Sequence, residues 1–378
     1  MKYLLVLLVI ATIGACDDSS PGKSHSSDAD TDSDGDGDSD SDADAGSDSD
    51  TDSDSDSDGD VCAVAAGCGS HKWACWPMPN PPSSGGDVPN PASLSDNGDG
   101  TVTDNLTCLT WEKSNPESVG DWWANYDRCA QLAADSFAGY DDWRLPTRIE
   151  MASITDVTLG YTGYYDVFDV TSGYYVTGSF WYKTILTEAD ADPNNDEDRV
   201  WGYGTNGFTS NAIVRSDSGL VARCVRGNGS GEAADEYAAE PANHYTIGTD
   251  AVTDNYTGLV WQRGYSDTLM TWSAAPSYCA GLTLDGLSGW RVPTITELAT
   301  TVNEAKVGGA IVDEAFPGNP VGCKEPQYWF WAAEASEVGG EGWGLSYCDG
   351  FTGWNSGGDG AWNYFPTANV RCVRNADS

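Results

Sequence analysis

An internal repeat constrains this chain more than any other feature of its sequence. Four blocks occur twice, in the same order, at offsets between 147 and 150 residues. The first block, Val-Thr-Asp-Asn with a following Leu-x-Trp, begins at residues 102 and 252, and the second, a Trp with a Cys seven residues later, begins at 122 and 272. The third block, Trp-Arg-x-Pro-Thr, begins at 143 and 290, and the fourth, Arg-Cys-Val-Arg, begins at 223 and 371. The repeat predicts two copies of one domain of about 130 residues, at 96–227 and 242–378, with a linker at 228–241.

The first block predicts a β-hairpin in each copy. Residues 101–103 and 109–111 alternate like two short strands around an Asp-Asn turn, and the second copy repeats this pattern. Gly258 closes the second turn, where a residue with positive φ fits. Cys108 stands at that position in the first copy, so we expect its turn to be built differently.

The middle blocks predict two helices in each copy. Trp122, Tyr126, Cys129 and Ala133 have helical spacing, and Pro276 is compatible with the equivalent helix only in its first turn. Thr147 and Thr294 are each followed three residues later by Glu, which is a capping box.

The later blocks predict strands. Aromatic runs at 180–182 and 328–330 and Val-rich closing strands at 221–225 and 370–373 follow the helices. The order hairpin, helix, helix, strands predicts an α+β fold with an antiparallel sheet.

Ten of the eleven cysteines suit a disulfide framework. The repeat predicts the pairs Cys129–Cys224 and Cys279–Cys372, and Cys323 and Cys348 occur only in the second copy and are expected to pair. The four remaining cysteines allow three connectivities; they are Cys62, Cys68, Cys75 and Cys108. We expect Cys108 to hold the Cys-rich segment 61–95 onto the first copy. A zinc site at Cys68, His71 and Cys75 is the alternative.

The N-terminus predicts export and a lipid anchor. Residues 1–15 combine Lys2 with an apolar run and small residues, as in a secretory signal peptide. Ile-Gly-Ala-Cys at 13–16 is similar to a bacterial lipobox, which would make Cys16 the acylated first residue. An ordinary signal peptide is the alternative. Export implies an oxidising compartment, and the anchor implies a membrane partner.

Residues 16–60 predict a disordered tether. They include eighteen Asp and one Lys but lack the large apolar side chains that offset the entropy of ordering. The predicted location is the bacterial cell envelope. The lipid anchor is expected in the outer membrane, and the spacer is expected to lift the folded part of the protein off the membrane so that it is surface-exposed.

The net charge of −41 excludes general binding to nucleic acid, which needs a basic surface. Residues 61–378 alone hold 41 acidic and 16 basic side chains. An acidic body also repels polyanionic glycans unless it has a local basic patch.

Together the hairpin, the helix Cys, Trp-Arg-x-Pro-Thr-x-x-Glu and Arg-Cys-Val-Arg resemble the Lcl C-terminal-like domain, whose namesake is part of a collagen-like adhesin that binds sulfated glycans. Arg-Leu-Pro-Thr-x-x-Glu and the terminal Arg-Cys-Val-Arg are also similar to the formylglycine-generating group, whose core is C-type-lectin-like. The resemblance implies two compact, loop-rich, lectin-like domains that display a variable surface.

The sequence does not favour an enzyme. Its three histidines lie outside the repeated blocks, so no His-based triad is repeated, and no cofactor is predicted. Arg144 and Arg291 are expected to bond core carbonyls or an acid. Calcium is the alternative ligand: 96–100, Glu325-Pro326-Gln327 and Trp354-Asn355-Ser356 are near misses to known loops.

The most ligand-like stretch is 341–364, where aromatic residues stand among Gly, Asn and Asp. The candidate ligand-binding residues are Trp343, Tyr347, Trp354, Asn355, Trp362 and Tyr364. The alternative is that these rings fill the core. The predicted function is a surface-displayed lipoprotein that binds a glycan or protein, and the alternatives are a structural envelope component and an enzyme of the formylglycine-generating type.

Overall fold

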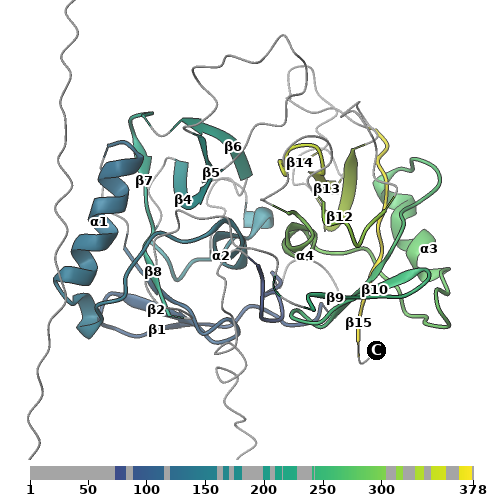
Figure 1. Cartoon of the computed structure of the whole chain (residues 1–378), viewed down its shortest axis with the longest axis horizontal. Coiled ribbons are helices and arrows are strands. Elements are labelled where there is room, and N and C mark those ends of the chain that lie inside the picture. The colour runs from purple at the N-terminus through teal and green to yellow at the C-terminus, as the bar shows by residue number, and fades with distance from the viewer. Residues whose placement is uncertain are drawn as a thin grey trace, which may run out of the picture. The chain divides into compact units, whose positions relative to one another are not determined.

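The computed structural model describes residues 73–81, 88–114, 120–159, 165–169, 174–180, 199–204, 209–214, 216–227, 241, 243–303, 312–317, 328–335, 342–354 and 366–376. Residues 56–378 form one unit that holds both copies of the repeat, coloured from purple to teal and from green to yellow in Figure 1. In this described part of the chain, none of the helices has both the length and the apolar composition needed to cross a bilayer.

The first domain combines helices with two four-stranded sheets. Its elements are β1 (Leu94–Asp96), β2 (Thr101–Asp104), β3 (Thr110–Glu112), α1 (Trp122–Ala134), η4 (Phe137–Gly139), α2 (Arg148–Ser153), η5 (Val157–Leu159), β4 (Tyr174–Phe180), β5 (Arg199–Gly204), β6 (Thr209–Val214), β7 (Leu220–Val221) and β8 (Val225–Arg226). The strand orders are β1-β2-β3-β8 and β6-β5-β4-β7. The second sheet contains one parallel pair, β4 with β7, which the sequence did not predict.

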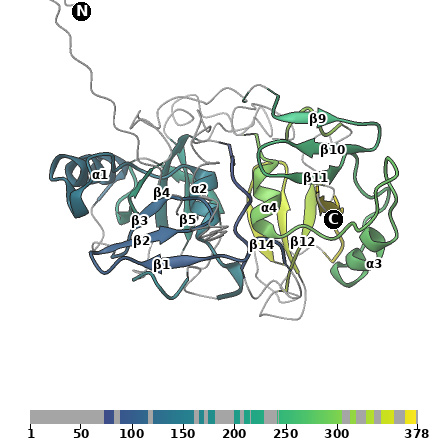
Figure 2. The ribbon, with the colours of Figure 1, turned by 90° about the horizontal axis from the view of Figure 1, so that it is seen from below.

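The second domain repeats this arrangement. Its elements are β9 (Tyr245–Ile247), β10 (Ala251–Asp254), β11 (Leu259–Gln262), η6 (Trp272–Ala274), α3 (Ala275–Ala280), α4 (Ile295–Thr300), β12 (Trp329–Ala335), β13 (Gly342–Ser346), β14 (Thr352–Trp354) and β15 (Val373–Asn375). Its strand orders are β15-β11-β10-β9 and β12-β13-β14, and Figure 2 shows β9, β10 and β11 side by side. The α+β class with antiparallel pairing is confirmed, with two small sheets per domain.

The two hairpins are built alike, which corrects the prediction for Cys108. Cys108 adopts φ 59° and Gly258 adopts φ 71°. Each donates its backbone N–H to the carbonyl of the turn's first Asp, Asp104 at 2.8 Å or Asp254 at 3.0 Å. The first domain therefore keeps the same left-handed turn with a non-glycine residue, a conformation that is sterically costly and needs its surroundings to hold it.

The helices start where the sequence predicts, because side chains satisfy their first N–H groups. The Asp121 side chain accepts a hydrogen bond from the N–H of Ala124 at the start of α1. Both predicted capping boxes are present, at Thr147 with Glu150 and at Thr294 with Glu297. Pro276 lies in the first turn of α3, which has six residues against thirteen in α1.

The closing segment of the first domain is not the single strand that we predicted for 221–225. Its ends belong to different sheets, since β7 pairs with β4 and β8 pairs with β3. The residues between β7 and β8 pass from one sheet to the other, and Cys224 in this crossing bonds to Cys129 of α1. In the second domain only 373–375 of the corresponding segment forms a strand, β15.

Both repeated disulfides are present. Cys129–Cys224 and Cys279–Cys372 join residues 95 and 93 positions apart, each with a Cα–Cα distance of 5.6 Å. Three further cysteines are also disulfide-bonded: Cys75, Cys108 and Cys348. The other predicted members of the framework, Cys62, Cys68 and Cys323, lie outside the described residues, as do Cys16 and the tether.

Candidate functional site

The arginines of the Trp-Arg-x-Pro-Thr-x-x-Glu motif are internal braces. Arg144 donates from both terminal nitrogens to the carboxylate of Glu150, at 2.8 and 2.7 Å. Arg291 bonds Glu297 in the same way, at 2.7 Å twice. Burial alone would lower the pKa of Arg144, but the Glu150 carboxylate raises it. Each Glu also accepts the N–H of its capping Thr, so the motif fixes a helix start and does not present Arg to a ligand.

The first Arg of Arg-Cys-Val-Arg is buried in an aromatic cage in both domains. The guanidinium of Arg223 lies 4.4 Å from the ring centroid of Phe168. That of Arg371 lies 4.7 Å from Phe316, the residue 148 positions after Phe168. Both arginines have no exposed surface. The charged motif is therefore part of the core of each domain, stabilised by cation–π contact and by bonds to backbone carbonyls.

Two of the predicted ligand-binding residues are core residues, which corrects our prediction for them. Trp343 is 4% exposed and Tyr347 is fully buried, with its hydroxyl 2.8 Å from that of Thr301. Trp343 on β13 corresponds to the buried Trp201 on β5. Each Trp directly precedes a Gly that pairs with the neighbouring seven-residue strand, β12 in the second domain and β4 in the first. These rings supply the apolar volume that a Gly-rich sequence lacks.

The rest of the predicted ligand stretch is only partly described. Trp354 ends β14, where its backbone pairs with Trp343. Asn355, Trp362 and Tyr364 lie outside the described residues.

The two domains contact each other through α2 and α4. Arg148, the first residue of α2, is 1% exposed and donates to the carbonyl of Ala299 at 2.9 Å, near the end of α4. Glu334 of β12 lies at the other end of α4, where both carboxylate oxygens accept the N–H of Ile295. A carboxylate at the N-terminus and a guanidinium at the C-terminus both stabilise the dipole of α4. A cation of the first domain thus bonds the end of a helix of the second.

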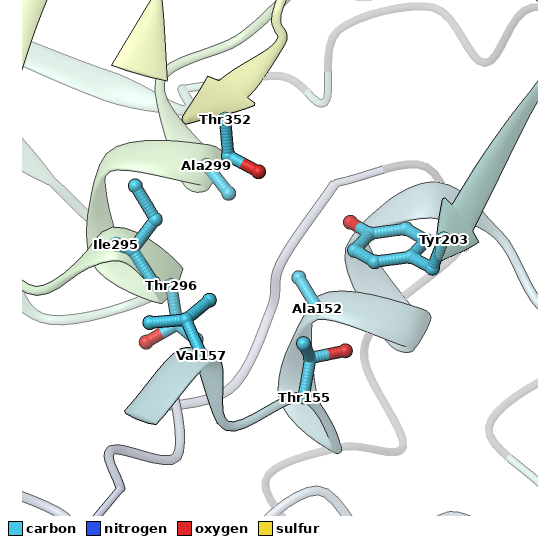
Figure 3. A pocket seen from close by; sticks show the side chains of 8 residues that line it. All are labelled: Ala152, Thr155, Val157, Tyr203, Ile295, Thr296, Ala299 and Thr352. Carbon is cyan, nitrogen blue, oxygen red and sulfur yellow. The ribbon is translucent and has the colours of Figure 1, made fainter. Parts of the chain in front are cut away.

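Between α2 and α4 the side chains leave a small hollow (Figure 3). It is lined by Ala152, Thr155, Val157, Tyr203, Ile295, Thr296, Ala299 and Thr352. Its volume of about 20 Å³ is enough for a bound water but not for an organic ligand. We therefore assign this hollow to domain packing.

The segment before the first domain packs on the second. Asn80 is fully buried and accepts hydrogen bonds from the hydroxyls of Thr294, at 2.6 Å, and Thr296, at 3.1 Å. Its amide donates to the carbonyl of Pro89 at 2.6 Å and lies 3.4 Å from Glu297. Trp73 meets the His244 ring edge-on, with centroids 4.8 Å apart. Residues 73–81, called the strap below, therefore bind the second domain. The prediction that Cys108 holds the Cys-rich segment on the first domain stays a prediction: Cys108 is disulfide-bonded, and Ser93 and Leu94, at the end of that segment, pair with Asn105 and Asp104 of the first domain.

Large hydrophobic side chains are exposed at only three of the described positions: Trp123 (55%), Tyr140 (38%) and Ile247 (54%). Trp123 lies in the first turn of α1, against the edge of the buried Trp122. Tyr140 directly follows η4, six residues after the last residue of α1. The second domain has Ser273 and Leu287 at the matching positions. Sequence reasoning missed both aromatics, because exposure cannot be read from residue type.

Tyr140 belongs to a compact charged cluster. The guanidinium of Arg226 lies over its ring, 3.9 Å from the centroid, and donates from Nε to Asp142 at 2.6 Å. Burial alone would raise the pKa of Asp142, but the bond and charge of Arg226 lower it. An aromatic ring and a carboxylate two residues apart thus hold one cation between them.

The calcium and zinc alternatives gain no support from the described residues. In the turn at 96–100, Asp96 accepts the N–H of Gly98 and Asp99 accepts the N–H and hydroxyl of Thr101, so both carboxylates bond their own turn. Among the residues that the structure describes, no group of three His, Cys, Asp or Glu side chains has metal-binding geometry. Cys75 is in a disulfide, which removes it as a thiolate ligand, while Cys68, His71 and 325–327 lie outside the described residues.

Comparison with known proteins finds one family in both copies of the repeat. Residues 100–226 and 250–374 each match the Lcl C-terminal domain family, and together they cover about two thirds of the chain. A search of curated proteins found no match. The duplicated braces, cages and disulfides fall inside these two ranges, and the chain therefore belongs to the Lcl C-terminal domain family, with two copies of the domain in tandem.

Proposed function

We propose that this chain is an exported lipoprotein of the bacterial envelope, anchored through Cys16, that displays two Lcl C-terminal domains on an acidic tether to bind a glycan or a protein. The observation that carries the proposal is where the two copies differ. They keep the same brace, cage and disulfide inside. On the surface, the first domain exposes Trp123 in α1 and Tyr140 just after η4, and the second domain has Ser273 and Leu287 at these positions. A shared interior with a divergent surface is typical of domains used for recognition.

A C-type-lectin-like architecture is part of the same proposal. Its support is the α+β composition, two small sheets per domain, and a disulfide from the first helix to the closing segment. We place the binding surface on the α1 face of the first domain, because Trp343 and Tyr347 are buried.

An enzyme of the formylglycine-generating type is the weaker candidate. Such chemistry needs redox or metal-binding thiols. The matched cysteines of the closing segments, Cys224 and Cys372, are both in disulfides, and the motif arginines are held by Glu. A structural envelope component remains the second candidate, favoured by the interdomain packing of Arg148 and Asn80.

Two measurements test the proposal. Radiolabelled palmitate should be incorporated into the wild-type protein in the bacterial cell and not into a Cys16→Ala variant, which tests the anchor. The full-length protein, purified from membranes in detergent, should bind specific spots on a glycan array or a defined envelope protein, with and without Ca²⁺. If the array stays blank while the protein co-purifies with envelope components in a fixed ratio, the structural candidate replaces ours.

A further inference from the structure

We propose that Trp123 and Asp127 on α1 of the first domain form a docking site for a cationic side chain, and that the partner is a Lys- or Arg-rich protein segment. This inference rests on the proposed function and names the partner class for its binding surface. It uses three observations: the exposed ring with its neighbouring carboxylate, an internal example of the same arrangement, and the charge of the surrounding surface.

Trp123 and Asp127 are neighbours on one face of α1. Residues four apart on a helix have Cβ atoms about 6 Å apart. Both side chains are exposed, and Trp123 has 55% of its surface accessible. Trp offers the strongest cation–π surface of the aromatic residues, and a carboxylate beside it adds a direct ion pair. Trp122 is fully buried and meets Trp123 edge-on, with ring centroids 4.8 Å apart. The exposed ring of Trp123 is therefore packed against a core residue.

The Tyr140 cluster shows the same chemistry within the chain. There Arg226 lies on the Tyr140 ring and bonds the Asp142 carboxylate. The guanidinium is thus held by a ring on its face and a carboxylate at its edge. Trp123 and Asp127 present the same two kinds of group in the first two turns of α1, and both are exposed. The 55% of the Trp123 surface that is accessible offers room for a Lys or Arg of the partner.

The surrounding charge selects a basic partner. Residues 121–142 contain five Asp and one Arg, and four of these Asp remain when Asp142, paired with Arg226, is left out. The matching residues 271–289 of the second domain contain one Asp and no base. Potentials of opposite sign attract partners and speed their association. The same charge repels anionic lipid surfaces and sulfated glycans, so a basic protein segment is the occupant that this face favours. Trp, Tyr and Arg are also the residues that dominate protein–protein contact energies.

The test titrates octa-lysine and octa-arginine peptides into the full-length protein in detergent by calorimetry at physiological salt. Trp123→Ser, the residue of the second domain, and Asp127→Asn should each weaken binding about five-fold, in line with the usual strength of cation–π and exposed ion pairs. Trp123→Phe should retain part of the affinity because it keeps a ring. Asp250→Asn removes one exposed charge in the second domain and should change affinity less than two-fold. Thermal melting of every variant checks that it folds.

Three results would overturn the inference. Trp123→Ser could bind as tightly as wild type, or Asp250→Asn could lose as much as Asp127→Asn, which would leave only general charge attraction. A neutral glycan from the array could bind through Trp123 while the peptides do not compete with it. In the first two cases the proposed function stands if the array or an envelope protein still reports binding; if the wild-type protein binds nothing at all, the proposed function itself fails.

Discussion

Arg148 of the first domain donates a hydrogen bond to the carbonyl of Ala299 in the second, 2.9 Å away and 151 residues later in the chain. Its guanidinium also lies 5.4 Å from the centroid of the Trp201 ring. A buried cation that serves the end of another domain's helix links the stability of the two domains. Its counterpart in the repeat, Ile295, is uncharged.

Replacing Arg148 by Met should therefore destabilise the protein by about 2–3 kcal/mol, the usual range for a buried hydrogen bond to a charged group. It should also separate urea unfolding into two transitions, one for each domain. Arg263→Met is the control, because Arg263 also bonds carbonyls, at 3.3 Å, but within its own domain and at a half-buried position. A single transition with an unchanged midpoint in Arg148→Met would contradict this role.

The strap should stabilise a domain that begins more than 160 residues after it. Asn80→Ala removes hydrogen bonds to Thr294 and Thr296 at the start of α4 and should cost about 2 kcal/mol. Hydrogen exchange measured by mass spectrometry should speed up in residues 291–302. Asn97→Ala is a matched control, because Asn97 also bonds two threonine hydroxyls but at the surface. Faster exchange confined to 93–112 in the Asn80 variant would place the strap on the first domain instead.

Each repeated disulfide should stabilise its own domain. Cys279→Ser opens a loop of 93 residues and should cost about 2–5 kcal/mol in the second domain. Cys129→Ser should do the same in the first. Calorimetric melting of both variants, with limited proteolysis to identify the unfolded domain, measures the effect. An unchanged melting temperature in either variant would mean that the bond adds no stability there.

Asp104 should make the first domain more stable at acid pH. Burial raises the pKa of Asp104 from 3.8 to about 6, although its bonds to the N–H groups of Leu106 and Thr107 and the hydroxyl of Thr107 oppose the shift. Because the folded state holds the proton more tightly than the unfolded state, this contribution is complete below pH 3.8 and is lost as the pH rises through 6. Its size is at most about 3 kcal/mol.

Asp104→Asn should remove this dependence. Urea unfolding at pH 4, 5, 6 and 7 should show the stability difference between wild type and variant changing across that window. Asp250→Asn, at an exposed turn, controls for the general loss of charge repulsion on acidification. Parallel pH profiles for wild type and Asp104→Asn would show that Asp104 does not titrate in this range.

Local and repeated features of this protein were predictable from its sequence. The capping boxes at Thr147 and Thr294 were predictable, because each Thr and its Glu are only three residues apart and bond each other locally. The hairpins followed from alternation, and the disulfides of Cys129 and Cys279 followed from the repeat, since two copies of one domain must place matched cysteines alike.

The exposure of aromatic residues was not predictable. Trp343 and Trp123 both stand in sequences that allow a surface or a core position, and the sheet buries the first while the helix exposes the second. Cys108 likewise appeared unable to replace Gly258, because the sequence does not show how a long-range environment holds a strained φ.

The sequence by itself determined that this protein has two copies of one disulfide-bonded α+β domain behind an acidic N-terminal segment, because repeats, caps and hairpins are set by residues near one another in the chain. Only the tertiary structure decided that Asn80 packs on the second domain, that Arg148 bonds the end of α4, and that, among the described residues, the exposed aromatics belong to the first domain. Those outcomes depend on contacts between residues 151 to 216 positions apart and on burial, which are settled when the whole chain packs and not by any local pattern.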